Sequence, residues 1–343
     1  MQKKLIALAV AGLVSAPAFA QSNVTIYGVA DAAIGIGEHG DNDFQGVVNG
    51  ILSGSRIGFR GTEDLGNGLK AVFTLEQGFD IGNGVAGPQV GPANDRDSAF
   101  SRQAFVGLSG GFGTVALGRQ YAPGYFFNYD AVLGALVSPQ SILSNGAGMS
   151  ITPNSRARWD NSLTYTGSFS GLTARAIYSA NAVETSMNPE DDDAYGLSLD
   201  YSNGPLKVGG LYQVIQNNAN DQKEWGLGAS YDFGILTVAG SYQDAESIGF
   251  GSVDGDLWQV GVIVPVGAAG NVHVAYGEVD LDSNRGAESW TVAYTHALSK
   301  RTTAYVGYNS TENESATGGF GLVGGTGFGD DSDLFVAGVR HTF

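Results

Sequence analysis

Cysteine is absent from the 343-residue chain, which excludes structural disulfides, zinc–thiolate sites and cysteine nucleophiles. Charged residues are also scarce, at 15% against about 25% in an average soluble domain. No stretch reaches the roughly 18 uninterrupted apolar residues of a membrane-spanning helix. If the mature chain crosses a bilayer, it must therefore do so with strands closed into a barrel.

Histidine is rare as well, and its four positions are His39, His273, His296 and His341. His296 and His341 lie on apolar faces, and the other two have no evident Ser and Asp partners in the sequence. The chain contains no Gly-x-Ser-x-Gly motif, and Gly35-Ile36-Gly37 lies in an expected strand without a following helix, which argues against a dinucleotide site. We therefore expect neither an enzyme nor a cofactor or metal.

Acidic residues outnumber basic ones, giving a net charge of −17, or −19 once Lys3 and Lys4 are removed with the N-terminal segment. Such a chain is a poor candidate for nucleic-acid binding. The acids cluster in expected loops, at Asp41 and Asp43, Asp191–Asp193, Asp254 and Asp256, and Asp330, Asp331 and Asp333. These clusters fit solvated loops; divalent-cation binding at the cell surface is the alternative, although none has the spacing of a calcium loop.

The first 20 residues have the pattern of a secretory signal peptide. Lys3 and Lys4 precede an apolar run over residues 5–14, and Ala18-Phe19-Ala20 is a small-x-small cleavage site. The apolar run is too short to span about 30 Å of hydrocarbon. We predict cleavage after Ala20, which leaves residues 21–343 as a single transmembrane domain.

Apolar residues alternate with polar or small ones along the whole mature chain. In residues 289–298 one side carries Trp290, Val292, Tyr294, His296 and Leu298, and the other carries Ser289, Thr291, Ala293, Thr295 and Ala297. A period of two indicates strands with one apolar face. Many such strands without an intervening helical domain predict an all-β, 16-stranded antiparallel barrel, apolar toward lipid and polar toward a water-filled lumen.

The expected strands are separated alternately by short Gly- and Asn-containing turns and by longer acidic loops, as the two rims of an outer-membrane barrel require. Their predicted bounds are 24–37, 55–62, 69–80, 101–110, 114–121, 161–168, 172–181, 193–203, 206–217, 223–233, 236–247, 254–266, 270–281, 288–299, 302–312 and 333–343. Some of the aromatic residues near strand ends should form the two interfacial girdles, and for each the alternative is a side chain inside the lumen. The candidates are Tyr27, Tyr178, Tyr201, Tyr212, Tyr231, Phe233, Tyr276, Trp290, Tyr294, Tyr305 and Tyr308.

Residues 122–157 form the longest connection, and their first part is apolar and aromatic. A long connection in a compact domain usually has a function. We predict that it folds inward, packs on the wall and narrows the channel.

Several segments resemble the general (non-specific) porins of Gram-negative outer membranes, in their β-proteobacterial form. They are residues 24–28 (VTIYG), 55–71 (SRIGFRGTEDLGNGLKA), 101–108 (SRQAFVGL), 113–120 (GTVALGRQ) and 339–343 (VRHTF). The resemblance implies a bacterial outer-membrane location, a homotrimer, an inward third loop, and passive diffusion of ions and small hydrophilic solutes. It further implies contact with outer-membrane lipid and lipopolysaccharide, and a terminal Phe343 that resembles the signal read by the barrel-assembly machinery.

Arginines mark the expected pore. Arg56 and Arg60 share a strand face opposite Ile57 and Phe59, so we place them in the lumen, because an arginine facing hydrocarbon costs about 2–4 kcal/mol. By motif, the family's basic ladder corresponds to Arg56, Arg102 and Arg158. Alternatively, these arginines only brace the wall by pairing with lumen acids such as Asp31 and Glu76.

The third loop departs from the enterobacterial pattern because it lacks the Pro-Glu-Phe-Gly-Gly motif, and Asp130 is its only acid. The predicted constriction set is Arg56, Arg60, Arg102, Arg158, Glu76 and Asp130. Its excess of arginine predicts a preference for small anions, since the outer loop acids are screened over a Debye length of about 8 Å. The alternatives are a solute-specific channel with an aromatic track of Tyr125, Phe126, Phe127 and Tyr129, and a surface-recognition protein.

Overall fold

The computed structural model describes residues 23–87, 99–132, 137–153, 157–182, 193–216, 220–248, 253–282, 285–315, 320–321 and 329–343. The predicted signal peptide lies outside these ranges, as do residues 133–136 and 154–156 of the third loop. Among the described residues, no helix is long and apolar enough to cross a bilayer.

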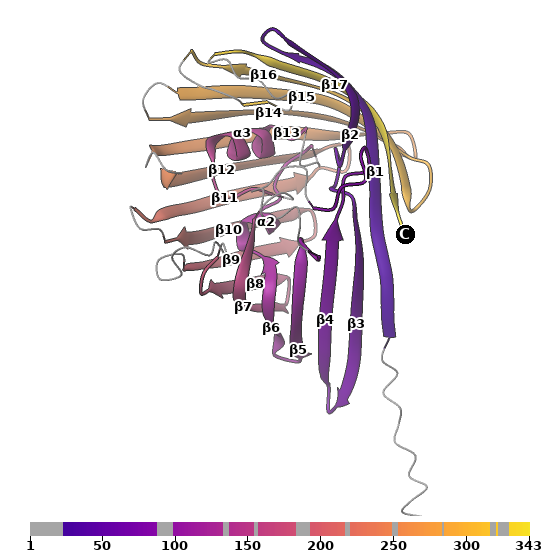
Figure 1. Ribbon diagram of the computed structural model, residues 1–343, viewed down its shortest axis with the longest axis vertical. Coiled ribbons are helices and arrows are strands. Elements are labelled where there is room, and N and C mark those ends of the chain that lie inside the picture. The colour runs from indigo at the N-terminus through magenta and orange to yellow at the C-terminus, as the bar shows by residue number, and fades with distance from the viewer. Residues whose placement is uncertain are drawn as a thin grey trace, which may run out of the picture.

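Within the described ranges, all strands belong to one antiparallel sheet in which each wall strand pairs with the next and β17 pairs back with β1, closing a barrel (Figure 1). The strands are β1 (Asn23–His39), β2 (Asn42–Asn49), β3 (Arg56–Gly66), β4 (Leu69–Gly78), β5 (Gln103–Gly110), β6 (Gly113–Tyr121), β7 (Arg158–Phe169), β8 (Leu172–Ser179), β9 (Ala194–Asn203), β10 (Leu206–Ile215), β11 (Gln222–Asp232), β12 (Thr237–Ile248), β13 (Val253–Val266), β14 (Gly270–Leu281), β15 (Arg285–Ala297), β16 (Thr302–Asn313) and β17 (Ser332–Thr342).

The 17 labelled strands occupy sixteen positions in the wall because β2 and β3 share one of them. β1 pairs with β3 over residues 23–29 and with β2 over residues 32–39. The prediction of a 16-stranded barrel is thereby confirmed, but β2 was missed. Its inward residues Phe44 and Val48 are apolar and pack on a buried cluster, so β2 lacks the polar-inside pattern of the other strands.

The predicted alternation holds in space. Trp290 and Val292 are exposed on β15, whereas Ser289 and Thr291, which alternate with them, are fully buried. The exposed apolar face therefore meets lipid. Trp225–Tyr242, Trp258–Tyr276 and Trp290–Tyr308 form three ring pairs on this face, with centroids 5.3–5.5 Å apart, and make part of an aromatic girdle. Tyr27 and Tyr305 follow the lumen alternative, because their hydroxyls donate to the inward-facing carboxylates of Glu76 and Asp31.

Short turns gather at the rim that also holds the end of the chain. In the β3–β4 turn Asn67 has a φ of 54°, a conformation that Asn and Gly tolerate better than other residues. At the C-terminus, the backbone N–H of Phe343 donates to Gly28 O and Gly28 N–H donates to Phe343 O, both at 3.1 Å. The last residue thus completes the pairing between β17 and β1.

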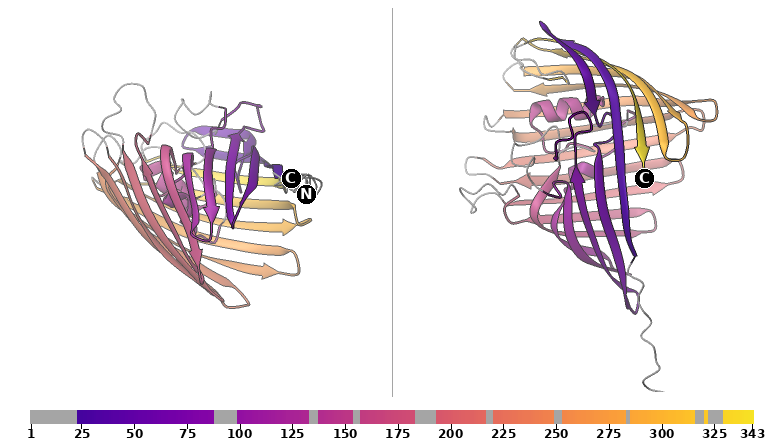
Figure 2. Two further views of the ribbon diagram at one scale, coloured as in Figure 1. Left: turned by 90° about the horizontal axis from the view of Figure 1, so that it is seen from below. Right: turned by 45° about the vertical axis from the view of Figure 1, so that its right-hand side comes forward.

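The described parts of the third loop, residues 122–132, 137–153 and 157, fold into the barrel, as predicted, and contain α2 (Pro123–Phe126) and α3 (Pro139–Ala147). Ser138 caps α3 by accepting from Ser141 N–H, and Gly148 ends it with a φ of 83°. α3 packs against β13, β14 and β15, and α2 against β6 and β8–β10. Figure 2 shows α3 lying against the orange strands inside the barrel. The described parts of the loop therefore narrow the lumen.

Candidate pore constriction

Polar side chains from six consecutive strands, β10 to β15, anchor the loop to the wall. Gln213 on β10 accepts from Gly124 N–H, Gln259 on β13 donates to Tyr129 O and Thr291 on β15 donates to Val137 O. The remaining anchors are Glu224 on β11, Gln243 on β12 and His273 on β14. Because these side chains satisfy polar groups of the loop away from bulk water, they hold it in one position.

Glu224 accepts two backbone hydrogen bonds from the loop. Its two carboxylate oxygens accept from the backbone N–H groups of Ser150 and Ile151 at 2.6 and 2.7 Å. The side chain is almost fully buried, and Gln222 also donates to it. Sequence reasoning missed this residue, although its alternation with Trp225 already placed it on the lumen face.

Glycines on β11 make room for the aromatic part of the loop. A Cβ at Gly228 would lie 2.3 Å from Tyr129 Cδ2, and one at Gly226 would lie 2.9 Å from Phe127 Cζ. Phe127 and Tyr129 are accordingly only 2% and 4% exposed. These two rings pack the loop to the wall, so an aromatic track in the lumen could use only Tyr125 and Phe126.

Asp130 braces the loop from within. Its carboxylate accepts from Val132 N–H at 2.8 Å and from the Ser138 hydroxyl. Among the described residues no ion pair joins it to an arginine, so its place in the constriction stays a prediction. Burial raises the pKa of the Asp130 carboxyl to about 6, although these hydrogen bonds oppose the rise.

The raised pKa of Asp130 predicts a loop that loosens as it ionises. Folding favours the protonated form, so the stabilisation is complete below the unfolded pKa of about 4 and is lost as pH rises through about 6. Asp130→Asn cannot ionise. We expect hydrogen exchange at Val132 and Ile142 N–H to be equal in both proteins near pH 4, and roughly ten- to a hundredfold faster in the wild type above pH 7. A ratio that does not change with pH would contradict this expectation.

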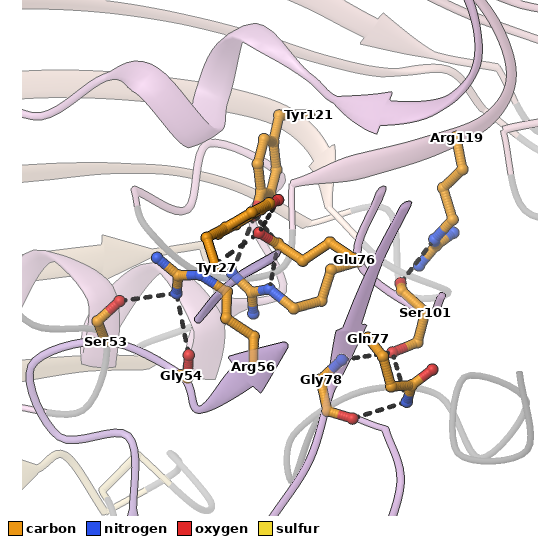
Figure 3. A network of polar contacts seen from close by, with 11 residues as sticks. Tyr27, Ser53, Gly54, Arg56, Glu76, Gln77, Gly78, Ser101, Arg119 and Tyr121 are labelled. Carbon is orange, nitrogen blue, oxygen red and sulfur yellow. Dashed lines mark hydrogen bonds and ion pairs between the residues drawn. The ribbon is translucent and has the colours of Figure 1, made fainter. Parts of the chain in front are cut away.

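The carboxylate of Glu76 on β4 forms ion pairs with two of the predicted arginines (Figure 3). Arg102 Nε lies 2.7 Å from its Oε1, and Arg56 Nε lies 3.4 Å from its Oε2. The hydroxyls of Tyr27 and Tyr121 donate to the same carboxylate at 2.9 and 3.0 Å. One carboxylate thus balances two arginines, as the bracing alternative supposed for Glu76. Asp31 instead accepts from Leu52 and Ser53 N–H and from the Tyr305 hydroxyl.

The other two predicted arginines lie over aromatic rings. Arg158 Cζ is 5.1 Å from the ring centroid of Tyr121, which stacks on Tyr125 with centroids 3.6 Å apart. Arg60 Cζ is 5.0 Å from the ring of Tyr27. In the part of the chain that the structure describes, neither arginine forms an ion pair. The structure therefore brings all four predicted arginines to one side of the lumen, with Glu76 among them.

Comparison with known proteins identifies the family. A family model described as Gram-negative porin matches residues 7–316. The chain belongs to the Gram-negative porin family. It is 34% identical to outer membrane porin protein 32 of Delftia acidovorans over the full length of both chains, and 33% identical to an outer membrane porin protein of Bordetella pertussis over 89% of this chain and 93% of that one.

A solved structure agrees with this assignment. The anion-selective porin from Comamonas acidovorans superposes with a TM-score of 0.77 at 29% identity, covering 94% of this chain and 100% of that one. The protein is therefore an outer-membrane β-barrel porin, a channel and not an enzyme.

Beside the loop the porin has a cavity of about 440 Å³. Its lining includes an arginine that sequence reasoning missed. Arg340 on β17 lines this cavity together with Arg56, Tyr125, Asn128 and His273. It lies directly opposite Asp31 in the β1–β17 register. The alternation of β17 could have identified it, because Val339 and His341 face outward on either side.

Proposed function

We propose that this porin is a diffusion channel that prefers small anions. The observation that carries the proposal is the charge of the constriction, where Arg56, Arg60, Arg102, Arg158 and Arg340 stand against Glu76, Asp31 and Asp130. Glu76 is shared between two arginines, and Asp130 is committed to the loop. Charge at a narrowing selects the ions that pass, so this excess of positive charge favours anions. The anion selectivity named for the Comamonas acidovorans porin is consistent with it.

A reversal potential tests this function. Under a KCl gradient across a planar bilayer, we expect the sign that chloride permeation produces. Replacing Arg56, Arg102 and Arg158 together by alanine should weaken it, whereas Arg301→Ala, a change at the exposed β15–β16 turn, should leave it unchanged. A cation-selective wild type would overturn the proposal.

A solute-specific channel is the second candidate, supported by the exposed ring of Phe126 and by Tyr125 at the wall of the cavity.

We also propose a homotrimer, consistent with the trimer form named for OmpT of Vibrio cholerae, which shares the fold at 14% identity. The outward-facing Phe343 is available to the barrel-assembly machinery. We further propose that the barrel contacts lipopolysaccharide and that residues 1–20 are removed as a signal peptide.

A further inference from the structure

A second cavity lies on the short-turn side of the loop. It measures about 250 Å³ and is bounded by β5–β8 and α2. Its lining includes Gln103, Phe105, Gln120, Phe126, Thr166 and Arg175, and it shares no lining residue with the larger cavity. Sites for drug-sized ligands measure about 300–1,000 Å³, so this one suits a solute with a single ring.

Arg175 is held by contacts that leave part of its guanidinium available to donate hydrogen bonds to a solute. Its Cζ lies 4.5 Å from the ring centroid of Phe126. Nη1 pairs with Asp200 at 2.5 Å, and the Tyr129 hydroxyl donates to the other oxygen of that carboxylate at 2.6 Å. Because Asp200 takes only Nη1, the remaining edge of the guanidinium can donate two parallel hydrogen bonds to a planar carboxylate.

The charge around this cavity favours an anion over a neutral solute. Arg175 and Asp200 balance each other, but Tyr121, which also lines the cavity, lies beneath Arg158. Arg158 is only 9% exposed, and within the described residues its Nε has no hydrogen-bond partner and no carboxylate pairs with the side chain. A buried guanidinium without a carboxylate partner attracts negative charge strongly.

We infer that this cavity is a binding station for small aromatic carboxylates. The carboxylate meets Arg175, and the ring packs on Phe126 and Phe105, with Ile177 and Ala116 completing the apolar lining. Phe126 is 37% exposed, so its ring remains available to a solute. The inference rests on the proposed anion preference, because the solute must pass or approach the arginines to reach the station.

Current block in single channels tests the inference. Benzoate is the probe, acetate lacks the ring and benzyl alcohol lacks the charge, each added on the short-turn side in KCl. We expect benzoate to block at concentrations at which the other two have no effect. Phe126→Leu should weaken the block about three- to tenfold, the contribution of an aromatic contact of this kind. Arg175→Lys, which keeps the charge but loses the planar fork, should weaken it too.

The control is Phe112→Leu, at the exposed β5–β6 turn outside the cavity, which benzoate should block as it blocks the wild type. Equal block by acetate and benzoate would contradict a binding station for aromatic carboxylates. Unchanged benzoate block in Phe126→Leu would contradict it as well. The KCl reversal potential of the same channels separates the two proposals. Anion selectivity without benzoate block refutes only the station, whereas cation selectivity refutes the proposed function itself.

Discussion

Glu76→Ala is expected to lower the free energy of unfolding by about 3–5 kcal/mol, the usual cost of removing one partner from a buried ion pair. Arg102 is almost as buried as Glu76 and would keep its charge without its 2.7 Å partner. Tyr27 and Tyr121 would also lose the acceptor of their hydroxyls. The measurement is the urea midpoint of the protein refolded in lipid vesicles.

Two further variants make this result specific. Glu76→Gln keeps one oxygen acceptor and should fall between alanine and the wild type in stability, while increasing anion selectivity by removing the negative charge. Glu63→Ala, on the exposed part of β3, should change the free energy of unfolding by less than about 0.5 kcal/mol. Equal stability of Glu76→Ala and Glu63→Ala would show that the arginines do not depend on Glu76.

Glu224→Ala is expected to release the far end of the loop. The Ser150 and Ile151 N–H groups would lose their acceptor, and each buried donor left without a partner costs about 1–3 kcal/mol. The barrel should remain closed, because the pairing of β11 with β10 and β12 uses backbone groups. Single-channel recording should therefore show a larger conductance and more open-channel noise than in the wild type.

The matched control is Glu246→Ala on the neighbouring strand, whose carboxylate is exposed and pairs only loosely with Lys223 at 3.9 Å. Its conductance and noise should equal those of the wild type. A quiet Glu224→Ala channel of unchanged conductance would mean that Gln213, Gln259 and Thr291 suffice to hold the loop.

Local alternation was enough to predict most of the barrel. Within each strand, which residues face lipid follows from a period of two, so Arg56 and Arg60 could be assigned to the lumen without coordinates. The same rule failed for β2, whose inward residues Phe44 and Val48 contact other apolar residues instead of water. Strand patterns therefore identify strands with a polar inner face better than a strand whose inner face packs on apolar residues.

The contacts of the constriction could not be predicted in the same way because they depend on closure and on the path of the loop. Tyr27 and Tyr121 are far apart in sequence, yet their hydroxyls meet at Glu76 across several strand pairings. Asp130 was assigned to the pore as the only acid of the loop, yet its partners are Val132 and Ser138 within that loop. Nothing in the residue pattern distinguishes a carboxylate that faces arginine from one that faces backbone N–H groups.

The pairing of β1 with β17 has a consequence for biogenesis. These strands lie at opposite ends of the chain and are joined through eleven registered residue pairs, from Val29 with Thr342 to His39 with Ser332. Until β17 has been synthesised, the sheet has two unpaired edges, which invite aggregation. The barrel can therefore close only after β17 is available to pair with β1.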